Sequence, residues 1–219
     1  MNWADLSNGL AGYLCFVLII TAHEFGHAWM ASRCGDDTAR LLGRVTLNPA
    51  AHLCPVGSVV LPLLSVLLVA NGAGHVANFI IGWGKPVPVN IGNLRHRVRD
   101  DIYVTLAGPA MNVVIAFVAV IVARLAVGAG VTLVAEAAMQ LAIISMFICF
   151  FNLIPVPPLD GSRVMRHIVG MGEEAFMNLT RFSYIILIII VQIPAVQMVM
   201  SVATYTSVGL MSWAVGLGG

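Results

Sequence analysis

The residues best suited to chemistry in this sequence form the segment His23-Glu24-Phe25-Gly26-His27, an HExxH pattern. On an α-helix, residues four apart lie on the same face about one turn from each other, so both imidazoles can bind one metal ion. Glu24 projects close by, where its carboxylate can accept a proton from zinc-activated water. A chance pattern of structural residues is the alternative, but ionisable groups in an apolar helix are costly without partners. The segment therefore predicts a zinc site with His23 and His27 as ligands and Glu24 as general base.

A catalytic zinc usually has three protein ligands, so two histidines leave one position to fill. Asp160 is the best candidate, because Pro155, Pro157 and Pro158 forbid a continued helix and give an extended stretch that could turn its carboxylate inward. An ordinary Asp-Gly turn after a helix is the alternative interpretation. Topology favours the ligand, since the preceding apolar run is expected to end on the side of the membrane where His27 lies. Four other carboxylates stand among basic residues and are poorer candidates: Asp36, Asp37, Asp100 and Asp101.

The composition places these residues in a membrane. Apolar residues make up 59% of the chain and charged residues 10%, with a mean hydropathy of +0.94. A water-soluble chain so poor in charge could not cover its own surface, so most of it must face the lipid bilayer. The formal net charge of +1 gives no reason to expect a nucleic-acid partner. The four cysteines have no CxxC spacing and are interpreted as reduced packing residues.

Long apolar runs recur along the chain, and several reach the roughly 20 residues that a helix needs to cross the hydrocarbon. They cover residues 10–30, 56–81, 102–127, 131–156 and 184–200, with a weaker run at 202–217. The first run lacks a basic flank and a small-residue cleavage site, so it is interpreted as a retained span rather than a signal peptide.

Lys and Arg concentrate in three connections, residues 32–55, 82–101 and 157–181, which are all cytoplasmic by the positive-inside rule. The run 56–81 then has both flanks on one side. It is too short for two spans and is broken at Asn71-Gly72-Ala73-Gly74, which favours a re-entrant or tilted helical hairpin.

One connection has the pattern of an edge strand. Pro86 and Pro88 alternate with Val87 and Val89, so one side of the segment lacks N–H groups. Such an edge could bind an extended peptide by strand addition, and a structural loop on the membrane surface is the alternative.

We therefore expect an all-α integral membrane protein, a polytopic helical bundle with a three-helix catalytic core, a re-entrant or tilted hairpin and a short membrane-associated edge strand. A single membrane-embedded metalloprotease domain would fill residues 1–219, with the catalytic core at about 10–170 and C-terminal helices at about 180–218.

These residues together resemble the site-2 protease family of intramembrane zinc metalloproteases. The HEFGH segment matches that family's zinc helix. Leu159-Asp160-Gly161, preceded by Asn152 and the prolines, resembles its second signature, whose aspartate is the third zinc ligand. Residues 82–90 and 107–112 are similar to the GWxKPVPVN and AGPxxN segments of prokaryotic members. The resemblance covers about residues 10–170 and indicates a minimal member, without a PDZ or CBS insertion.

The resemblance implies one Zn²⁺ per chain, held by His23, His27 and Asp160, with Glu24 as general base in peptide-bond hydrolysis. It also suggests that Asn112 donates a hydrogen bond to the developing oxyanion, although bonding to a neighbouring helix is equally compatible with this residue. The implied substrate is a transmembrane segment of a membrane protein, cut during regulated intramembrane proteolysis. The implied location is the cell (inner) membrane, with the active site toward the cytoplasmic side and no particular oligomeric state.

The remaining histidines favour structural interpretations. His96 and His167 stand beside arginines and are expected to face phospholipid headgroups. His52 is not expected to be a ligand, and Cys54 stands where related minimal sequences have Asp, so a role for this loop stays open.

Three other functions fit parts of the sequence. A divalent-metal transporter is the first, because some transporters of the ZIP family carry HExxH-like segments, but further ligands along neighbouring helices would then be expected. A catalytically silent membrane adaptor is the second, although Glu24 and the three expected ligands are all intact. The third is a metalloprotease that cuts soluble peptides at the membrane face.

Overall fold

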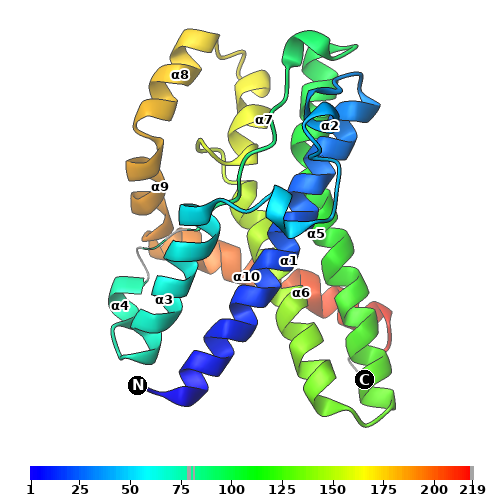
Figure 1. Ribbon diagram of the computed structural model, residues 1–219, viewed down its shortest axis with the longest axis vertical. Coiled ribbons are helices and arrows are strands. Elements are labelled where there is room, and N and C mark those ends of the chain that lie inside the picture. Colours follow the sequence, from blue (N-terminus) through cyan, green and yellow to red (C-terminus); the bar gives the residue numbers. More distant parts are fainter. Residues whose placement is uncertain (78–79, 81, 218–219) are drawn as a thin grey trace.

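A computed structural model describes residues 1–77, 80 and 82–217, and all structural statements below refer to these residues. The described chain is helical (Figure 1), as the sequence predicts. The α-helices are α1 (Trp3–Arg33), α2 (Thr38–Leu41), α3 (Leu61–Ala70), α4 (Gly74–Ala77), α5 (Arg97–Gly128), α6 (Thr132–Asn152), α7 (Asp160–Ile168), α8 (Glu173–Arg181), α9 (Ser183–Val191) and α10 (Pro194–Ala214). Short helical turns are η1 (Pro49–Ala51), η2 (Pro55–Val60) and η3 (Ile91–Asn93).

Three helices, α1, α5 and α6, are long and apolar enough to cross a membrane. Helices α8 and α9 are together also long and apolar enough to span a membrane, although they are bent by 61° at their junction. The described residues thus hold three or four candidate spans, and the chain is a membrane protein.

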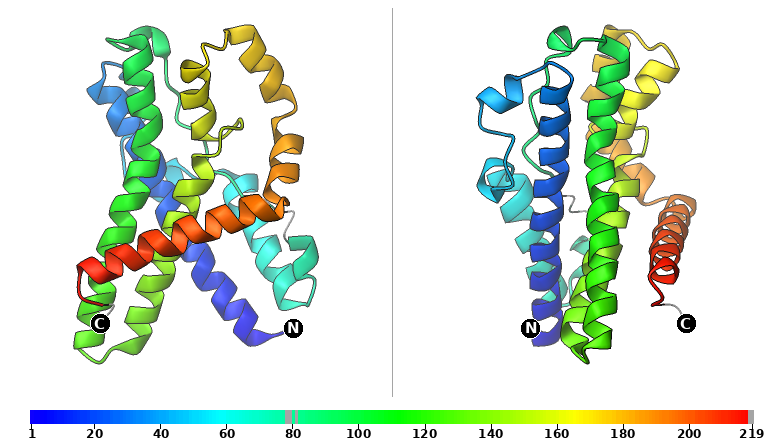
Figure 2. Two further views of the ribbon diagram at one scale, coloured as in Figure 1. Left: turned by 180° about the vertical axis from the view of Figure 1, so that it is seen from behind. Right: turned by 90° about the vertical axis from the view of Figure 1, so that its right-hand side faces the viewer.

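The apolar run 184–200 is not one helix. Helix α9 ends at Val191, and α10 begins at Pro194. Proline removes a backbone donor and clashes with the preceding turn, but it is tolerated as the first residue of a helix. Helix α10 then lies across α5 and α6 (Figure 2), so the C-terminal helices meet the bundle at an angle rather than extending it.

The expected hairpin begins with η2, which continues into α3. Helix α3 ends at Ala70, and a turn with Gly72 at φ 81° leads into α4, which packs against α3. The end of the predicted run 56–81 includes residues 78, 79 and 81, and the end of the predicted C-terminal helices includes residue 218. These four residues lie outside the described part of the chain.

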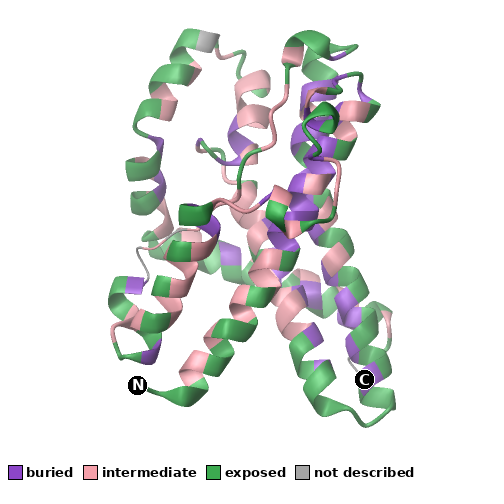
Figure 3. Ribbon diagram, viewed as in Figure 1, coloured by how far each residue is buried: buried purple, intermediate pink, exposed green. Residues whose placement is uncertain are grey.

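Helices α1, α5 and α6 pack against one another and form the predicted three-helix core. Small residues make the contacts close, as is usual between membrane helices. A Cβ atom at Gly26 would stand 2.7 Å from the Ala107 carbonyl oxygen of α5, so only glycine allows this approach. Figure 3 shows that the buried residues of α1 gather in its C-terminal half, around the HExxH segment, while its N-terminal half is exposed or half-buried.

The expected edge strand is not a strand in the described structure. The N–H of Trp83 donates to the Gly57 carbonyl (3.0 Å), and the N–H of Lys85 donates to the His52 carbonyl (2.8 Å). Both acceptors belong to turns rather than to a neighbouring strand. A strand needs a partner ladder, and within the described residues none is offered to residues 82–90.

Candidate metal centre

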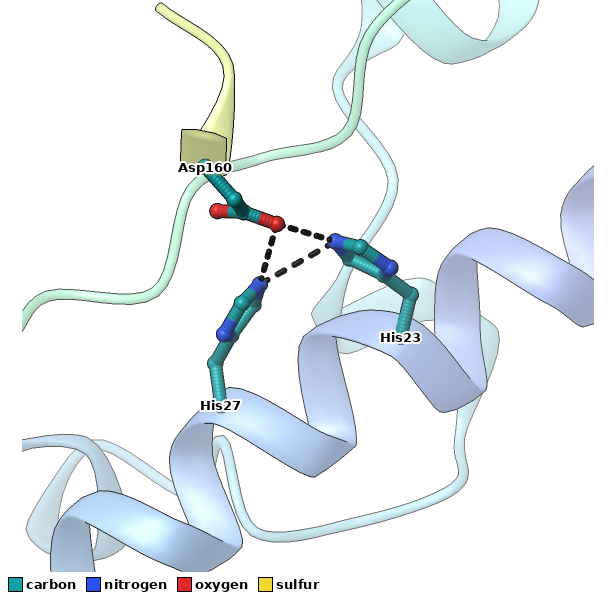
Figure 4. A group of neighbouring side chains, drawn as sticks. All are labelled: His23, His27 and Asp160. Atoms are coloured by element: carbon teal, nitrogen blue, oxygen red, sulfur yellow. Dashed lines mark hydrogen bonds and ion pairs between the residues drawn. The ribbon is translucent and has the colours of Figure 1, made fainter. Parts of the chain in front are cut away.

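His23, His27 and Asp160 come together although α1 and α7 are distant in sequence (Figure 4). The Oδ2 atom of Asp160 lies 3.1 Å from His23 Nε2 and 3.3 Å from His27 Nε2, and the two Nε2 atoms are 3.0 Å apart. Ligand atoms about 2.1 Å from a tetrahedral zinc ion stand about 3.4 Å from one another. The three distances are close to that value, and two imidazoles with one carboxylate are a usual catalytic zinc ligand set. The site therefore fits zinc.

The imidazole of His27 is oriented by α5. Its Nδ1 lies 2.7 Å from the carbonyl oxygen of Val104, so Nδ1 carries the proton and Nε2 presents a lone pair toward Asp160. His23 Nδ1 is buried and has no hydrogen-bond partner among the described residues. Outer contacts of this kind fix the orientation of a metal-binding imidazole, and the structure supplies one for His27.

Asp160 is the first residue of α7 and reaches the histidines from the end of the proline-rich connection. Burial alone would raise the pKa of the Asp160 carboxyl, but the facing imidazoles, His27 first and then His23, hold that pKa well below its usual range. The next residue, Gly161, lies against the end of α6, where a Cβ would collide with the Leu153 carbonyl. The close return of the chain past α6 therefore requires glycine immediately after the carboxylate.

Helix α5 also touches the imidazoles directly. A Cβ built on Gly108 would meet the Nε2 atoms of both His23 and His27. A glycine at this position leaves the space in which an ion bound by the histidines would sit.

The three side chains open into a cavity of about 450 Å³ that contains residues of α1, α5, α6, α7, α9 and the segment 82–90. Its walls are mainly apolar, with aromatic side chains from Phe16, Phe151 and Tyr184. Cavities of this size and character are typical of sites that bind an apolar chain or ligand.

Glu24 is buried and lines the same cavity. Its Oε2 accepts a hydrogen bond from the N–H of Val87 (3.1 Å), whereas Oε1 makes no hydrogen bond within the described residues. The carboxylate thus connects the HExxH helix with the segment 82–90 and retains one oxygen for a proton.

Asn112 and Asn152, the asparagines of the two motifs, differ in their position relative to the cavity. Asn112 is fully buried and is not part of the cavity wall, and its side-chain nitrogen and oxygen have no partner among the described residues. Asn152, the last residue of α6, lines the cavity and donates from Nδ2 to the Ile148 carbonyl (3.0 Å). The sequence showed Asn152 only as part of the second signature, and nothing in the chain's pattern ranked it above Asn112.

Three polar residues that were assigned to the membrane surface or to basic loops lie inside the protein instead, two of them buried and one half-buried. His167 was expected to face phospholipid headgroups, but its Nε2 lies 2.7 Å from Oδ2 of Asp101. Asp101 is 2% exposed, and Asp36 is fully buried. His52 is also buried, with Nε2 2.7 Å from the Thr46 carbonyl, and it is not in the group of candidate ligands.

A helical membrane fold with a buried His-His-Asp group beside a glutamate is the arrangement of a zinc metalloprotease. The chain belongs to peptidase family M50, the site-2 protease family, whose sequence model matches residues 11–140 and 131–195. The resemblance noted from the motifs is confirmed, and the chain is a member of a family of zinc-dependent peptide-bond hydrolases.

Similar proteins carry names of the same kind. "Putative zinc metalloprotease YwhC" of Bacillus subtilis is 34% identical over 178 residues, covering 77% of this chain and 74% of that protein. "Putative zinc metalloprotease Rip2" of Mycobacterium tuberculosis is 27% identical over 189 residues, covering 86% of this chain and 68% of that protein. Its counterpart in Mycolicibacterium smegmatis is 27% identical over 203 residues, covering 89% and 74%. No solved structure matches this chain.

Proposed function

We propose that this protein is an intramembrane zinc metalloendopeptidase that hydrolyses peptide bonds in transmembrane segments of membrane proteins. The observation that carries the proposal is the meeting of His23, His27 and Asp160 beside Glu24 in one cavity between apolar helices. The basic residues of the three connections support a location in the cell (inner) membrane with the active site toward the cytoplasm. In that orientation the hairpin of η2, α3 and α4 is re-entrant or tilted.

The three ligands would hold one Zn²⁺ per chain, which when bound polarises the substrate carbonyl and lowers the pKa of water to about 7. Glu24 accepts a proton from the attacking water at Oε1 and returns it to the leaving amine. The bond from Val87 to Oε2 keeps the carboxylate aimed at the cavity. The apolar wall excludes bulk water, which strengthens each of these interactions.

The segment 82–90 is the proposed receptor for an unwound substrate. The N–H groups of Trp83, Lys85 and Val87 are all used within the protein, while Pro86 and Pro88 have no N–H. The residues that alternate with Trp83, Lys85 and Val87 therefore offer mainly carbonyl oxygens to a neighbouring chain. A substrate chain can add to them as a strand and donate its own N–H groups, beside the candidate ligands.

Asp36 anchors the far end of this segment, and Asp36→Ala is expected to raise KM about tenfold with zinc content unchanged. Its carboxylate accepts from the N–H of Asn90 (2.7 Å) and from Asn93 Nδ2 (3.0 Å), so the alanine variant releases residues that orient the substrate. The measurement is the KM and kcat of cleavage in detergent, with metal analysis of the same preparation. Asp37→Ala is the matched control, because the Asp37 side chain is exposed and bonds Ser32 and Arg40 rather than the segment 82–90. Equal KM values for the two variants would remove Asp36 from substrate binding.

Two asparagines are candidates for the oxyanion donor, and the geometry favours Asn152 over Asn112. We expect Asn152→Ala to lower kcat on the order of 100-fold with little change in KM, since an oxyanion donor acts in the transition state. Asn112→Ala serves as the comparison and is expected to change thermal stability more than kcat, because Asn112 is buried outside the cavity. A larger kcat loss for Asn112→Ala would return the role to Asn112.

Metal content distinguishes the proposal from its rivals. Purified wild type is expected to hold one zinc per chain, and Asp160→Ala to bind zinc more than about 100-fold more weakly, because loss of an outer-shell partner alone typically costs 10–100-fold. The measurement is zinc titration against a competing chelator. Zinc flux into liposomes that persists in a proteolytically inactive variant would favour the transporter instead. If folded wild type binds no zinc, the proposal fails.

A further inference from the structure

Helix α7 is attached to α5 by the buried carboxylate of Asp101. The His167 imidazole is 2.7 Å from Asp101, and Arg163 Nη1 lies 3.8 Å from the other oxygen, Oδ1. The Asp101 side chain is 3% exposed and that of His167 16% exposed. A carboxylate buried to this degree requires partners, and within the described residues its hydrogen bond to His167 and its longer ion pair with Arg163 both reach α7, while Oδ1 makes no hydrogen bond.

The His167–Asp101 contact and the metal centre are separated by the same number of residues on α7 and on α5. Asp160 and His167 are seven residues apart on α7, and Asp101 and Gly108 are seven residues apart on α5, so each pair spans two helical turns on one face. His167 meets Asp101, while Asp160 meets the two imidazoles against which Gly108 lies. One face of α7 therefore meets α5 directly at His167 and, at Asp160, meets the two imidazoles of α1 that lie against α5.

Helix α7 is short and depends on contacts with its neighbours. It is nine residues long, which is too short for a helix to be stable alone, and no side chain caps its N-terminus. The chain before it is the proline-rich connection that ends α6, and α5 is the main helix on which it packs. Without the Asp101 contact, α7 would keep its packing at Gly161, beside Asp160, but would lose its polar attachment to α5.

We infer that Asp101 is a positioning residue for the metal centre. Its carboxylate binds His167 and Arg163 of α7 and thereby holds Asp160, on the same helix, beside His23 and His27. The inference rests on the proposed function, because it treats Asp160 as a zinc ligand. It gives α5 two roles, since the same helix orients His27 through Val104.

The test is the zinc affinity of purified full-length variants, measured by competition with a chelator, together with the visible spectrum of Co²⁺ bound in place of zinc. Asp101→Ala and His167→Ala are each expected to raise the zinc Kd 10–100-fold and to shift the Co²⁺ bands, because Asp160 is no longer held in place. The double variant is expected to be no weaker than either single variant, as for two members of one contact.

Asp100→Ala is the matched control. Asp100 is also 2% exposed and lies on the same turn, but it bonds His96 N–H and Arg99 rather than α7. It is expected to lower stability with zinc affinity within about twofold of wild type. His167→Ala removes a partly exposed side chain and keeps the inference testable if Asp101→Ala does not fold.

The results of these measurements distinguish the positioning role of Asp101 from the proposed function. If Asp160→Ala weakens zinc binding while folded His167→Ala binds zinc like wild type, the positioning role is wrong and the proposed function stands. If Asp160→Ala itself binds zinc normally, the ligand set of the proposed function is wrong. An equal loss of affinity in Asp100→Ala would show that the end of α5 acts only through general stability, which also overturns the inference.

Discussion

Glu24→Gln is expected to reduce kcat on the order of 1000-fold while one zinc per chain is retained. A general base typically contributes 10²–10⁴-fold, and glutamine cannot accept the proton. The amide oxygen of glutamine can still accept the hydrogen bond from Val87 N–H, so the segment 82–90 is expected to keep its place. The variant therefore tests proton transfer by Glu24 without disturbing the segment 82–90.

The measurement combines metal analysis with single-turnover cleavage of a single-span substrate by wild type and variant. Glu24→Asp is a useful companion, because it keeps the charge but moves the carboxylate back by one methylene. Near wild-type cleavage by Glu24→Gln would exclude Glu24 as the base. Loss of zinc together with activity would instead assign Glu24 to the integrity of the metal centre.

Gly108→Ala is expected to weaken zinc binding by about 10–100-fold and to remove most activity. The new Cβ would meet Nε2 of both His23 and His27, the atoms that face the ion. In a helix interior, alanine is otherwise more favourable than glycine by about 1 kcal/mol, so helix propensity cannot explain a loss.

Gly12→Ala is the control for this variant. It lies inside α1, and its Cβ would meet only Gln140 Nε2 at 3.7 Å, an ordinary contact. Zinc affinity should be unchanged in Gly12→Ala and reduced in Gly108→Ala, both measured by chelator competition. Wild-type affinity in Gly108→Ala would show that the imidazoles do not face α5 as the structure has them.

Local periodicity was sufficient to predict part of this molecule. The helical repeat places His23 and His27 on one face, and the prolines before Asp160 end α6 so that the chain can turn back. Apolar length was sufficient to predict α1, α5 and α6 as membrane helices. Each of these features is determined by residues that lie close together in the sequence.

Contacts between distant segments were beyond such reasoning. Asp101 and His167 each stand among arginines, so the sequence suggested solvated or headgroup-facing side chains, whereas helix packing pairs them. The alternation of Pro86 and Pro88 with valines suggested an edge strand, but it could not show that no partner strand stands beside it in the described structure. Choosing between Asn112 and Asn152 likewise needed the position of the cavity.

The most direct test of the central claim is cleavage in liposomes that contain the purified protein and a single-span substrate, with product masses read by mass spectrometry. We predict cuts within the hydrophobic segment of the substrate, lost on chelation and restored by zinc. Cleavage confined to soluble peptides or to the substrate's exposed flanks, or cleavage that persists with zinc fully removed, would contradict an intramembrane zinc peptidase.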